Sequence, residues 1–566
     1  MPYRAPVADF RFLFDHVIGF ENVVATPRFA EATPDMTDAI LTEAAKLCEE
    51  VLAPLNRAGD LHPAYLENGI VRTSPGYADG YAAIADGGWI GMSASPEVGG
   101  MGLPMTLTTA VNEMMSSACL SLQLNPLMTQ GQIEALEHHA SDAIKHLYLP
   151  KLISGEWNGT MNLTEPQAGS DVGALRSKAV PNGDGTYAIS GQKIYISWGD
   201  NDFTQNVCHL VLARLPDGAP GTKGISLFMV PKLIPDAEGN PGKQNNLRVV
   251  SVEHKMGLHG SPTAVMQYDD ATGWLVGPEH GGMAAMFTMM NNARLGVGVQ
   301  GLGAGEGAYQ HALAYAQDRK QGKAGGTGNI IEHADVRRML AEMKSDLYVA
   351  RAIALMNAMA IDMATATDDA DWKARAAFLT PICKAFGTDV GIDVANKGIQ
   401  VHGGMGFIEE TGAAQFARDV RVTAIYEGTN GIQAMDLVAR KMMDGGDAAG
   451  RLLDEIEQSA EAAKTTHPQL AQAVWNAAET LREATDILIA QDLGDRFAGA
   501  VPYLRAFARV LGGHVHLLSA MQGDATRTRL ATFYINRILP EHESLLAQVK
   551  AGAADVTAIE VADLVA

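Results

Sequence analysis

The fold is decided around the run Leu163-Thr-Glu-Pro-Gln-Ala-Gly-Ser-Asp171, because the pattern of the chain changes there. Before it, apolar residues recur with the period of a helix, as at Ile40, Ala44, Leu47 and Val51. After it, short β-branched and aromatic runs alternate with Asn-Gly, Asp-Gly and Pro-Gly turns, which is typical of strands and hairpins. These runs are 186–190, 193–197, 207–213, 224–230 and 264–268. The helical period returns after about residue 281.

The 566 residues are too many for one hydrophobic core, so several domains are expected. We predict an α+β protein with an N-terminal helical domain at 1–158 and a β-barrel-like middle domain at 159–280. A helical bundle follows at 281–445, and a further C-terminal helical region at 446–566. In this last region, two striped helices run from Leu470 to Leu488 and from Leu504 to Leu518. No catalytic motif occurs there, so packing or subunit contact is the favoured role.

Composition argues against several classes of partner. The formal charge of −22 opposes binding to nucleic acid or to anionic membranes. The apolar run from Ala352 to Met363 is interrupted by Asn357 and Asp362 and is too short to span a bilayer, so no membrane insertion is expected. The start, MPYRAPVADFRF, lacks the apolar run of a signal peptide, and the four cysteines have no metal-type spacing. A cytoplasmic protein with reduced thiols is therefore predicted.

A candidate catalytic carboxylate is Glu427, in the run Ile425-Tyr-Glu-Gly-Thr-Asn-Gly-Ile-Gln433. Gly428 accepts backbone angles that other residues resist, and Thr429 can cap a following helix. The carboxylate would then stand between two helices, where it can face a cavity. The alternative is a glutamate that only complements the positive end of a helix.

The run from Gly296 to Gly301 matches the dinucleotide-binding pattern GxGxxG. That pattern has this meaning only after a strand and within a βαβ unit. Here the preceding residues, Met286 to Arg294, have helical spacing, so we interpret the glycines as small residues that allow close packing of helices.

Taken together, the runs 163–171, 425–433 and Gln400-Val-His-Gly-Gly-Met-Gly-Phe407 resemble the acyl-CoA dehydrogenases in order and spacing, over about residues 80 to 442. The resemblance implies FAD-dependent dehydrogenation of an acyl-CoA between its α and β carbons, to give the trans-2-enoyl-CoA. Glu427 would take the α proton, and flavin N5 would accept the β hydride.

The same resemblance implies flavin contacts at Thr164, Ser170 and Ser197, with Thr429 also near the cofactor. Ser197 lies in the run Lys193-Ile-Tyr-Ile-Ser-Trp-Gly199, where Tyr195 replaces a usual tryptophan. A hydroxyl donor and an aromatic face are both retained. One departure is Asn162, which stands where a small residue is usual.

A second group of residues is implied to bind the distant end of the cofactor. Arg319 would hold the FAD pyrophosphate of a neighbouring subunit, a task that suits its two-pronged donor geometry. A solvated helix charge is the alternative, and the glycine-rich loop after Arg319 departs from the family pattern. Gln400, Gly403 and Gly404 resemble the adenine and ribose clamp, although Gln415 replaces a usual basic residue. Binding of a neighbour's FAD by Arg319 would require a homo-oligomer. A dimer is favoured, because the C-terminal helices would cover a surface that shorter tetrameric relatives use for assembly.

The histidines are further candidates for chemistry. His402 lies within the glycine clamp, so a hydrogen-bonded structural histidine is favoured over a general base. No metal is expected, since neither His138-His139 nor His514-Val-His516 has carboxylate or cysteine partners at ligand spacing.

Some family members carry the base on another helix, immediately before a substrate-side arginine. Here that position is Ala293, beside Arg294, and alanine cannot accept a proton. Arg294 and Gly428 are the implied substrate contacts. In its length, the chain resembles a bacterial branch of the family that has an extra C-terminal region. This resemblance suggests 3-methylmercaptopropionyl-CoA or another short to medium acyl-CoA as the substrate. Electron-transfer flavoprotein is the expected acceptor. An acyl-CoA oxidase that uses O₂ and a non-catalytic, nucleic-acid-binding relative are the alternatives.

Overall fold

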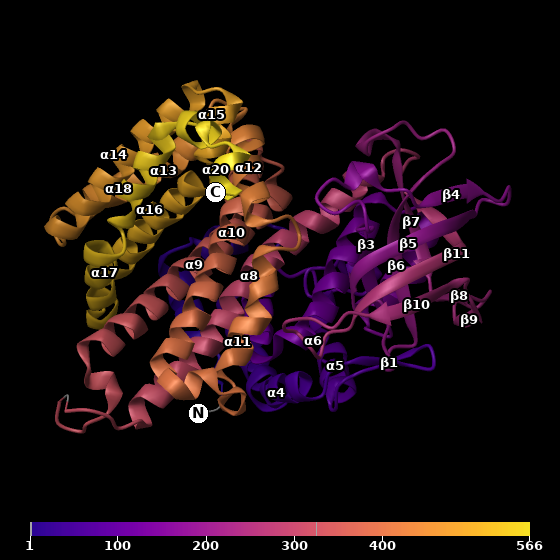
Figure 1. Ribbon diagram of the computed structural model, residues 1–566, viewed down its shortest axis with the longest axis horizontal. Coiled ribbons are helices and arrows are strands. Elements are labelled where there is room, and N and C mark those ends of the chain that lie inside the picture. The colour runs from indigo at the N-terminus through magenta and orange to yellow at the C-terminus, as the bar shows by residue number, and fades with distance from the viewer. Residues whose placement is uncertain (1–2, 324, 566) are drawn as a thin grey trace.

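The computed structural model describes residues 3–323 and 325–565 (Figure 1). Its N-terminal part is helical, and Thr33 caps α3 by accepting from the N–H of Met36. The helical spacing from Ile40 to Val51 is confirmed, although a π-helical turn at Leu47–Leu52 interrupts the regular α-helix. The elements of this part are α1 (Val7–His16), α2 (Phe20–Val24), α3 (Pro34–Lys46), α4 (Ala53–Leu61), β1 (Tyr65–Glu67), β2 (Ile70–Arg72), α5 (Tyr77–Asp86), α6 (Met105–His139) and α7 (Asp142–Ile153).

The middle part is a β-domain that closes on itself. Strand β11 pairs with β5 and β7, β5 pairs with β4, and β6 pairs with β4 and β7, so five strands form a ring. Its strands are β3 (Trp157–Asn162), β4 (Lys178–Pro181), β5 (Tyr187–Ser197), β6 (Asn206–Arg214), β7 (Ile225–Pro231), β8 (Leu233–Pro235), β9 (Pro241–Gln244), β10 (Leu247–Val252) and β11 (Thr263–Val276). The barrel-like prediction is confirmed, and two of the predicted runs join into the single strand β5.

A bundle of long helices follows, with α8 (Gly282–Asp318), α9 (Ala334–Thr367), α10 (Ala370–His402), α11 (Ala413–Val420) and α12 (Asn430–Ala439). The GxGxxG run lies inside α8, not after a strand. A Cβ atom on Gly298 would lie 2.6 Å from the backbone oxygen of Cys383, and one on Gly301 would lie 2.5 Å from the Cα of Thr388. The glycines therefore let α8 and α10 approach closely, as predicted.

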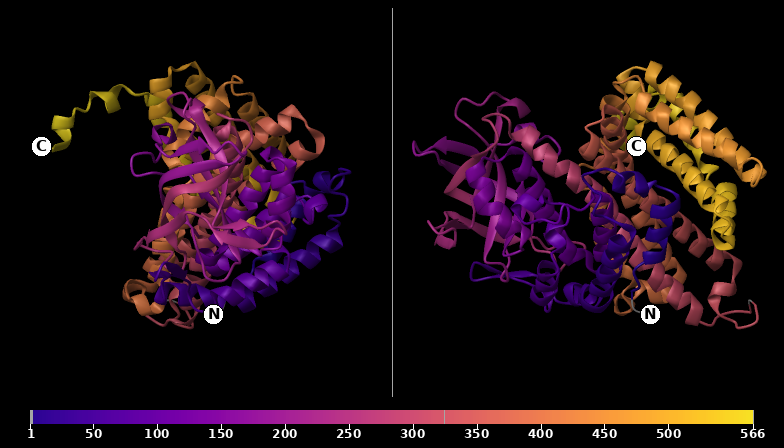
Figure 2. Two further views of the ribbon diagram at one scale, coloured as in Figure 1. Left: turned by 90° about the vertical axis from the view of Figure 1, so that its right-hand side faces the viewer. Right: turned by 180° about the vertical axis from the view of Figure 1, so that it is seen from behind.

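The C-terminal region packs on this bundle, and the Leu470–Leu488 stripe is buried. Arg509 pairs with Asp346 of α9 at 2.6 Å, and the hydroxyl groups of Tyr348 and Ser519 are 2.8 Å apart. Its helices are α13 (Asp447–Ala463), α14 (Pro468–Ala490), α15 (Leu493–Ala498), α16 (Ala500–Met521), α17 (Ala525–Arg537), α18 (Glu541–Ala551), α19 (Ala554–Ala558) and α20 (Val561–Val565). The last two extend away from the body of the protein (Figure 2).

Among the described residues, one helix, α9, is long and apolar enough to cross a membrane by length and composition alone. The run from Ala352 to Met363 lies inside this helix of 34 residues, so the shortness of the run does not by itself exclude a membrane span. However, 89% of its apolar window is buried inside the protein, which is the pattern of a core helix.

Candidate functional site

Glu427 lies in a strained turn between two helical segments. A 3-10 helix ends at Ala424, and α12 begins at Asn430 with Thr429 as its cap, whose hydroxyl accepts from the N–H of Ile432 at 3.3 Å. Glu427 itself has a left-handed backbone with φ of 54°, and Gly428 has φ of 84°. The turn predicted from the sequence is confirmed. A left-handed non-glycine residue costs roughly 1 to 3 kcal/mol, and such strain is found most often at functional sites.

The electrostatics of Glu427 suit a base. The residue is half-buried, yet protein atoms surround its carboxyl group, and this burial raises the pKa to about 7. Arg294 and Lys384 oppose the shift without cancelling it. Within residues 3–323 and 325–565 the carboxylate accepts no hydrogen bond, so it is free to receive a proton near neutral pH. Neighbouring Ala293 is buried and has no such group.

Arg294 is a buried cation beside this carboxylate. It is 7% exposed on α8, and burial lowers its pKa. Its Nε atom has no hydrogen-bond partner among the described residues. A buried guanidinium with a free donor near Glu427 is suited to an anionic or carbonyl group of a ligand.

Three residues that sequence reasoning missed hold the Glu427 turn. The side-chain amide of Gln433 donates to the backbone oxygen of Glu427 at 3.2 Å. Lys384 donates to the side-chain oxygen of Asn430 at 2.9 Å. Gln433 and Asn430 belong to the run around Glu427, which was a local signal. Lys384 lies 43 residues before Glu427, and no local pattern points to it.

The predicted flavin-binding residues Thr164 and Ser197 are brought to the same end of β5. The N–H of Ile194 donates to the backbone oxygen of Thr164 at 2.9 Å. The adjacent residues Lys193 and Glu165 form a buried ion pair at 2.8 Å. Burial alone would raise the pKa of Glu165, but Lys193 and N–H donors outweigh it and lower the pKa to about 2. The ion pair fixes the loop to the strand. Ser170 is exposed farther along the loop.

Ser197 lies between two strained residues. Tyr195 and Trp198 both have left-handed backbones, with φ of 60° and 53°. The Trp198 ring is buried, and its Nε1 atom donates to the carbonyl of Ser121 on α6 at 3.2 Å. Tyr195 is 62% exposed, so its aromatic ring is accessible, and Ser197, two residues later, is half-buried.

Asn162 departs from the family pattern for a structural reason. It is fully buried, accepts from the hydroxyl of Tyr268 at 2.9 Å, and donates to the hydroxyl of Thr160. The amide is therefore part of a satisfied network inside the β-domain.

The remaining predicted residues are not brought to Glu427. Arg319, Gln400, Gly403 and Gly404 are all exposed. Arg319 follows the end of α8, 25 residues after Arg294, which corresponds to roughly 37 Å along the helix axis. Within one chain, these residues therefore form a separate surface.

His402 is structural, as expected. Its Nδ1 atom lies 2.7 Å from the carbonyl of Gly398, and its ring stacks on Tyr315 at a centroid distance of 4.4 Å. Within the described ranges, no group of three or more His, Cys, Asp or Glu side chains can hold a metal ion.

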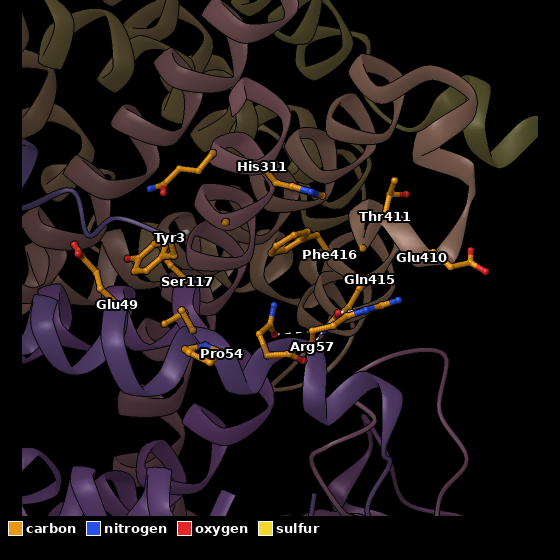
Figure 3. Close-up of a pocket in the computed structure, with 16 residues that line it drawn as sticks. Tyr3, Glu49, Pro54, Arg57, Ser117, His311, Glu410, Thr411, Gln415 and Phe416 are labelled. Carbon is orange, nitrogen blue, oxygen red and sulfur yellow. Dashed lines mark hydrogen bonds between the residues drawn. The ribbon is translucent and has the colours of Figure 1, made fainter. Parts of the chain in front are cut away.

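A cavity of about 390 Å³ lies elsewhere, between the N-terminal segment, α4, α6, α8 and α11 (Figure 3). Tyr3, Arg57, His311 and Phe416 are among its lining residues. Its lining includes neither Glu427 nor Thr164 nor Ser197, so this cavity is not the candidate catalytic site.

Comparisons with known proteins identify the family and its domains. Models of the acyl-CoA dehydrogenase N-terminal, middle and C-terminal domains match residues 34–156, 160–271 and 280–443, and a model described as acetyl-CoA dehydrogenase C-terminal like matches 452–560. The chain is 45% identical over 540 residues to the 3-methylmercaptopropionyl-CoA dehydrogenase of Ruegeria pomeroyi, covering 93% of this chain and 92% of that protein.

Solved structures show the same fold over nearly the whole chain. Caenorhabditis elegans ACDH-11 in complex with C11-CoA has a TM-score of 0.80 at 20% identity, covering 98% of this chain and 96% of that one. An acyl-CoA dehydrogenase from Bacillus anthracis complexed with FAD has a TM-score of 0.75 at 20% identity, covering 98% and 92%. At these identities the likeness concerns the fold alone.

Proposed function

The chain belongs to the acyl-CoA dehydrogenase family, and we propose that it dehydrogenates its acyl-CoA to the trans-2-enoyl-CoA with Glu427 as base and FAD as cofactor. The observation that carries this assignment is the carboxylate of Glu427. The backbone of Glu427 is strained. Its carboxylate is surrounded by protein and has no hydrogen-bond partner among the described residues, and burial raises its pKa to about 7.

Glu427 removes the α proton of the thioester. A carboxylate with an ordinary pKa is too weak a base for this task, and the raised pKa brings it closer to the activated α carbon. The family resemblance places the thioester oxygen against the backbone N–H of Glu427, where enolate charge develops. Gln433 supports this step by holding the backbone oxygen of Glu427.

The end of β5 fits a flavin. Thr164 and Ser197 offer hydroxyl groups there, and the exposed ring of Tyr195 offers an aromatic face. FAD, when bound, accepts the β hydride. Ser170 and Thr429 complete the set that we assign to the near part of the cofactor.

Arg319, Gln400, Gly403 and Gly404 are proposed to hold the distant end of a neighbouring subunit's FAD. Their exposure, and the roughly 37 Å along α8 between Arg319 and Arg294, support a role across a subunit boundary. A homodimer is the assembly that we favour, with the C-terminal helices covering a further surface. Light scattering tests this assembly, since a monomer would reject the shared site and a tetramer would reject the covering role.

Three further proposals concern the cellular role. The similarity to a 3-methylmercaptopropionyl-CoA dehydrogenase suggests that thioester or another short to medium acyl-CoA as substrate, bound through Arg294 and Gly428. Electron-transfer flavoprotein is the proposed acceptor. A cytoplasmic location is proposed from the sequence.

The test is an anaerobic titration of the purified yellow protein with a panel of acyl-CoAs. Bleaching of the flavin band by at least one of them is expected. Absence of flavin, or a flavin that no acyl-CoA bleaches, would contradict the proposal. The rate of reoxidation by air, compared with that by electron-transfer flavoprotein, then separates a dehydrogenase from an oxidase.

A further inference from the structure

A buried chain of amide and hydroxyl groups connects the catalytic turn to α6. The hydroxyl of Tyr426, the residue before Glu427, donates to the side-chain oxygen of Gln300 on α8. The amide nitrogen of Gln300 then donates to the side-chain oxygen of Gln123 at 3.1 Å. Gln300 and Gln123 are 0% and 1% exposed. Such a chain is costly to bury unless every group in it is satisfied.

This series of hydrogen bonds ends at the side-chain nitrogen of Gln123, a donor without an acceptor among the described residues. The Nε2 atom of Gln123 has no hydrogen-bond partner among residues 3–323 and 325–565. Two residues later, neither side-chain atom of Asn125, which is 0% exposed, has a partner in the same ranges. Buried polar groups without partners are rare in folded proteins, and each therefore requires an explanation. A ligand that supplies the acceptor is one.

The position of Gln123 matches the path of an acyl group. The segment 121–125 follows a break in α6 at Cys119, whose φ and ψ are −156° and 86°. On one side its Ser121 carbonyl accepts from Trp198, which adjoins Ser197. On the other side Gln123 is linked through Gln300 to the turn of Glu427. Hydrogen bonds therefore link this segment to the residue after Ser197 and, through Gln300, to the residue before Glu427.

The geometry of the proposed reaction then sets the direction in which the acyl group extends. The α proton goes to Glu427 and the β hydride leaves on the side of Ser197, so the α and β carbons lie between these residues. Segment 121–125 is linked to the neighbours of both residues, so we place the part of the acyl group beyond the β carbon against it.

We propose that Gln123 is a specificity-determining residue that donates a hydrogen bond from Nε2 to a heteroatom attached to the β carbon of the acyl group. This inference rests on the proposed function. Ether and thioether acyl groups offer an acceptor to the Nε2 donor of Gln123, and the thioether does so more weakly because sulfur is a weak acceptor. An alkyl group of equal length offers none. Gln300 and Tyr426 are positioning residues, since they orient the amide of Gln123.

The test compares 3-methoxypropionyl-CoA, 3-methylmercaptopropionyl-CoA and pentanoyl-CoA, which differ only in O, S or CH₂ at one position. The measured quantity is the ratio of kcat/KM for each heteroatom substrate to that for pentanoyl-CoA. Comparing this ratio between variants cancels the intrinsic reactivity of the substrates. In Gln123→Met the ratio should fall about 3- to 10-fold for the ether, the size of one neutral hydrogen bond, and less for the thioether.

Gln300→Met and Tyr426→Phe should lower the same ratio by smaller factors, with flavin content retained. Gln132→Met is the matched control, because Gln132 is equally buried on α6 but lies against Gly159 of β3. It should leave the ratio as in the wild type. If Gln123→Met loses its flavin, the ratio in Gln300→Met decides the question.

An unchanged ratio in a flavin-loaded Gln123→Met protein, or in Gln300→Met where the first variant fails, would overturn the role of Gln123. Reduction of the flavin by pentanoyl-CoA would still leave the proposed function intact in that case. By contrast, failure of every acyl-CoA to reduce the wild-type flavin would reject the proposed function itself.

Discussion

Glu113 and Glu427 both have pKa values raised to about 7, as does Glu134, and burial is the main cause for each. The surroundings of Glu113 and Glu427 are opposite. Glu113 lies within the regular part of α6, and Arg351 donates to its two oxygens, with Nη2 at 2.6 Å from Oε1 and Nε at 3.1 Å from Oε2. Glu427 has a strained backbone and no hydrogen bond to its carboxylate within the described residues.

The comparison shows that a shifted pKa alone does not identify a base. Arg351 also bonds to Glu306 at 2.8 Å and Asp9 at 3.2 Å, so the charge of Glu113 is committed to a network that joins α1, α6, α8 and α9. A proton taken up there would disrupt packing. Of these two glutamates, Glu427 is the one whose carboxylate accepts no hydrogen bond within the described residues, which leaves it available to exchange a proton with a ligand.

Glu427→Gln should give the largest change in activity. The amide has the same shape but cannot accept the α proton, so flavin reduction should slow by about 10²- to 10⁴-fold. Rapid mixing with acyl-CoA under anaerobic conditions measures this rate, with flavin content and acyl-CoA binding as controls. Near wild-type reduction would remove Glu427 from the mechanism.

Arg351→Met should affect stability instead. It leaves Asp9, Glu113 and Glu306 without their shared cation, and breaking a buried pair costs about 3 to 5 kcal/mol. The midpoint of thermal unfolding should fall by several degrees. Arg338→Met on the same helix is the control, because Arg338 is exposed and its pairs with Asp335 and Glu342 contribute less than about 1 kcal/mol. Equal midpoints for the two variants would show that the network is not structural.

Arg319→Ala should have a smaller effect, and on flavin rather than on substrate. Loss of one charge-assisted hydrogen bond costs roughly 1.5 to 3 kcal/mol, so the variant should purify partly without flavin. The ratio of flavin to protein absorbance measures this, with exposed Arg338→Ala for comparison. Full flavin content together with weaker acyl-CoA binding would place Arg319 at a substrate site.

Features that depend on residues adjacent in the sequence could be predicted from the sequence alone. The turn at Gly428, the cap at Thr429 and the helix-packing role of the glycines from Gly296 to Gly301 were all predicted, because local backbone preferences decide them. The helical, β and helical order also followed from hydrophobic period.

Contacts between distant segments could not be predicted in this way. Gln300 bonds to Gln123, 177 residues away, and Arg351 bonds to Glu113, 238 residues away. No period or motif encodes such pairs, because the packing of α6 against α8 and α9 brings them together. For the same reason, support of the Glu427 turn by Lys384 was missed.

The pH dependence of kcat/KM tests the central claim most directly, since it reports the ionisation of the free enzyme. Burial raises the pKa of Glu427 to about 7, and the base is active only when deprotonated. We predict that kcat/KM falls about tenfold per pH unit below pH 7 and reaches a plateau above it. A profile that is flat from pH 5.5 to 8.5, or one whose ionisation near 7 persists in Glu427→Gln, would contradict the assignment of Glu427 as the base.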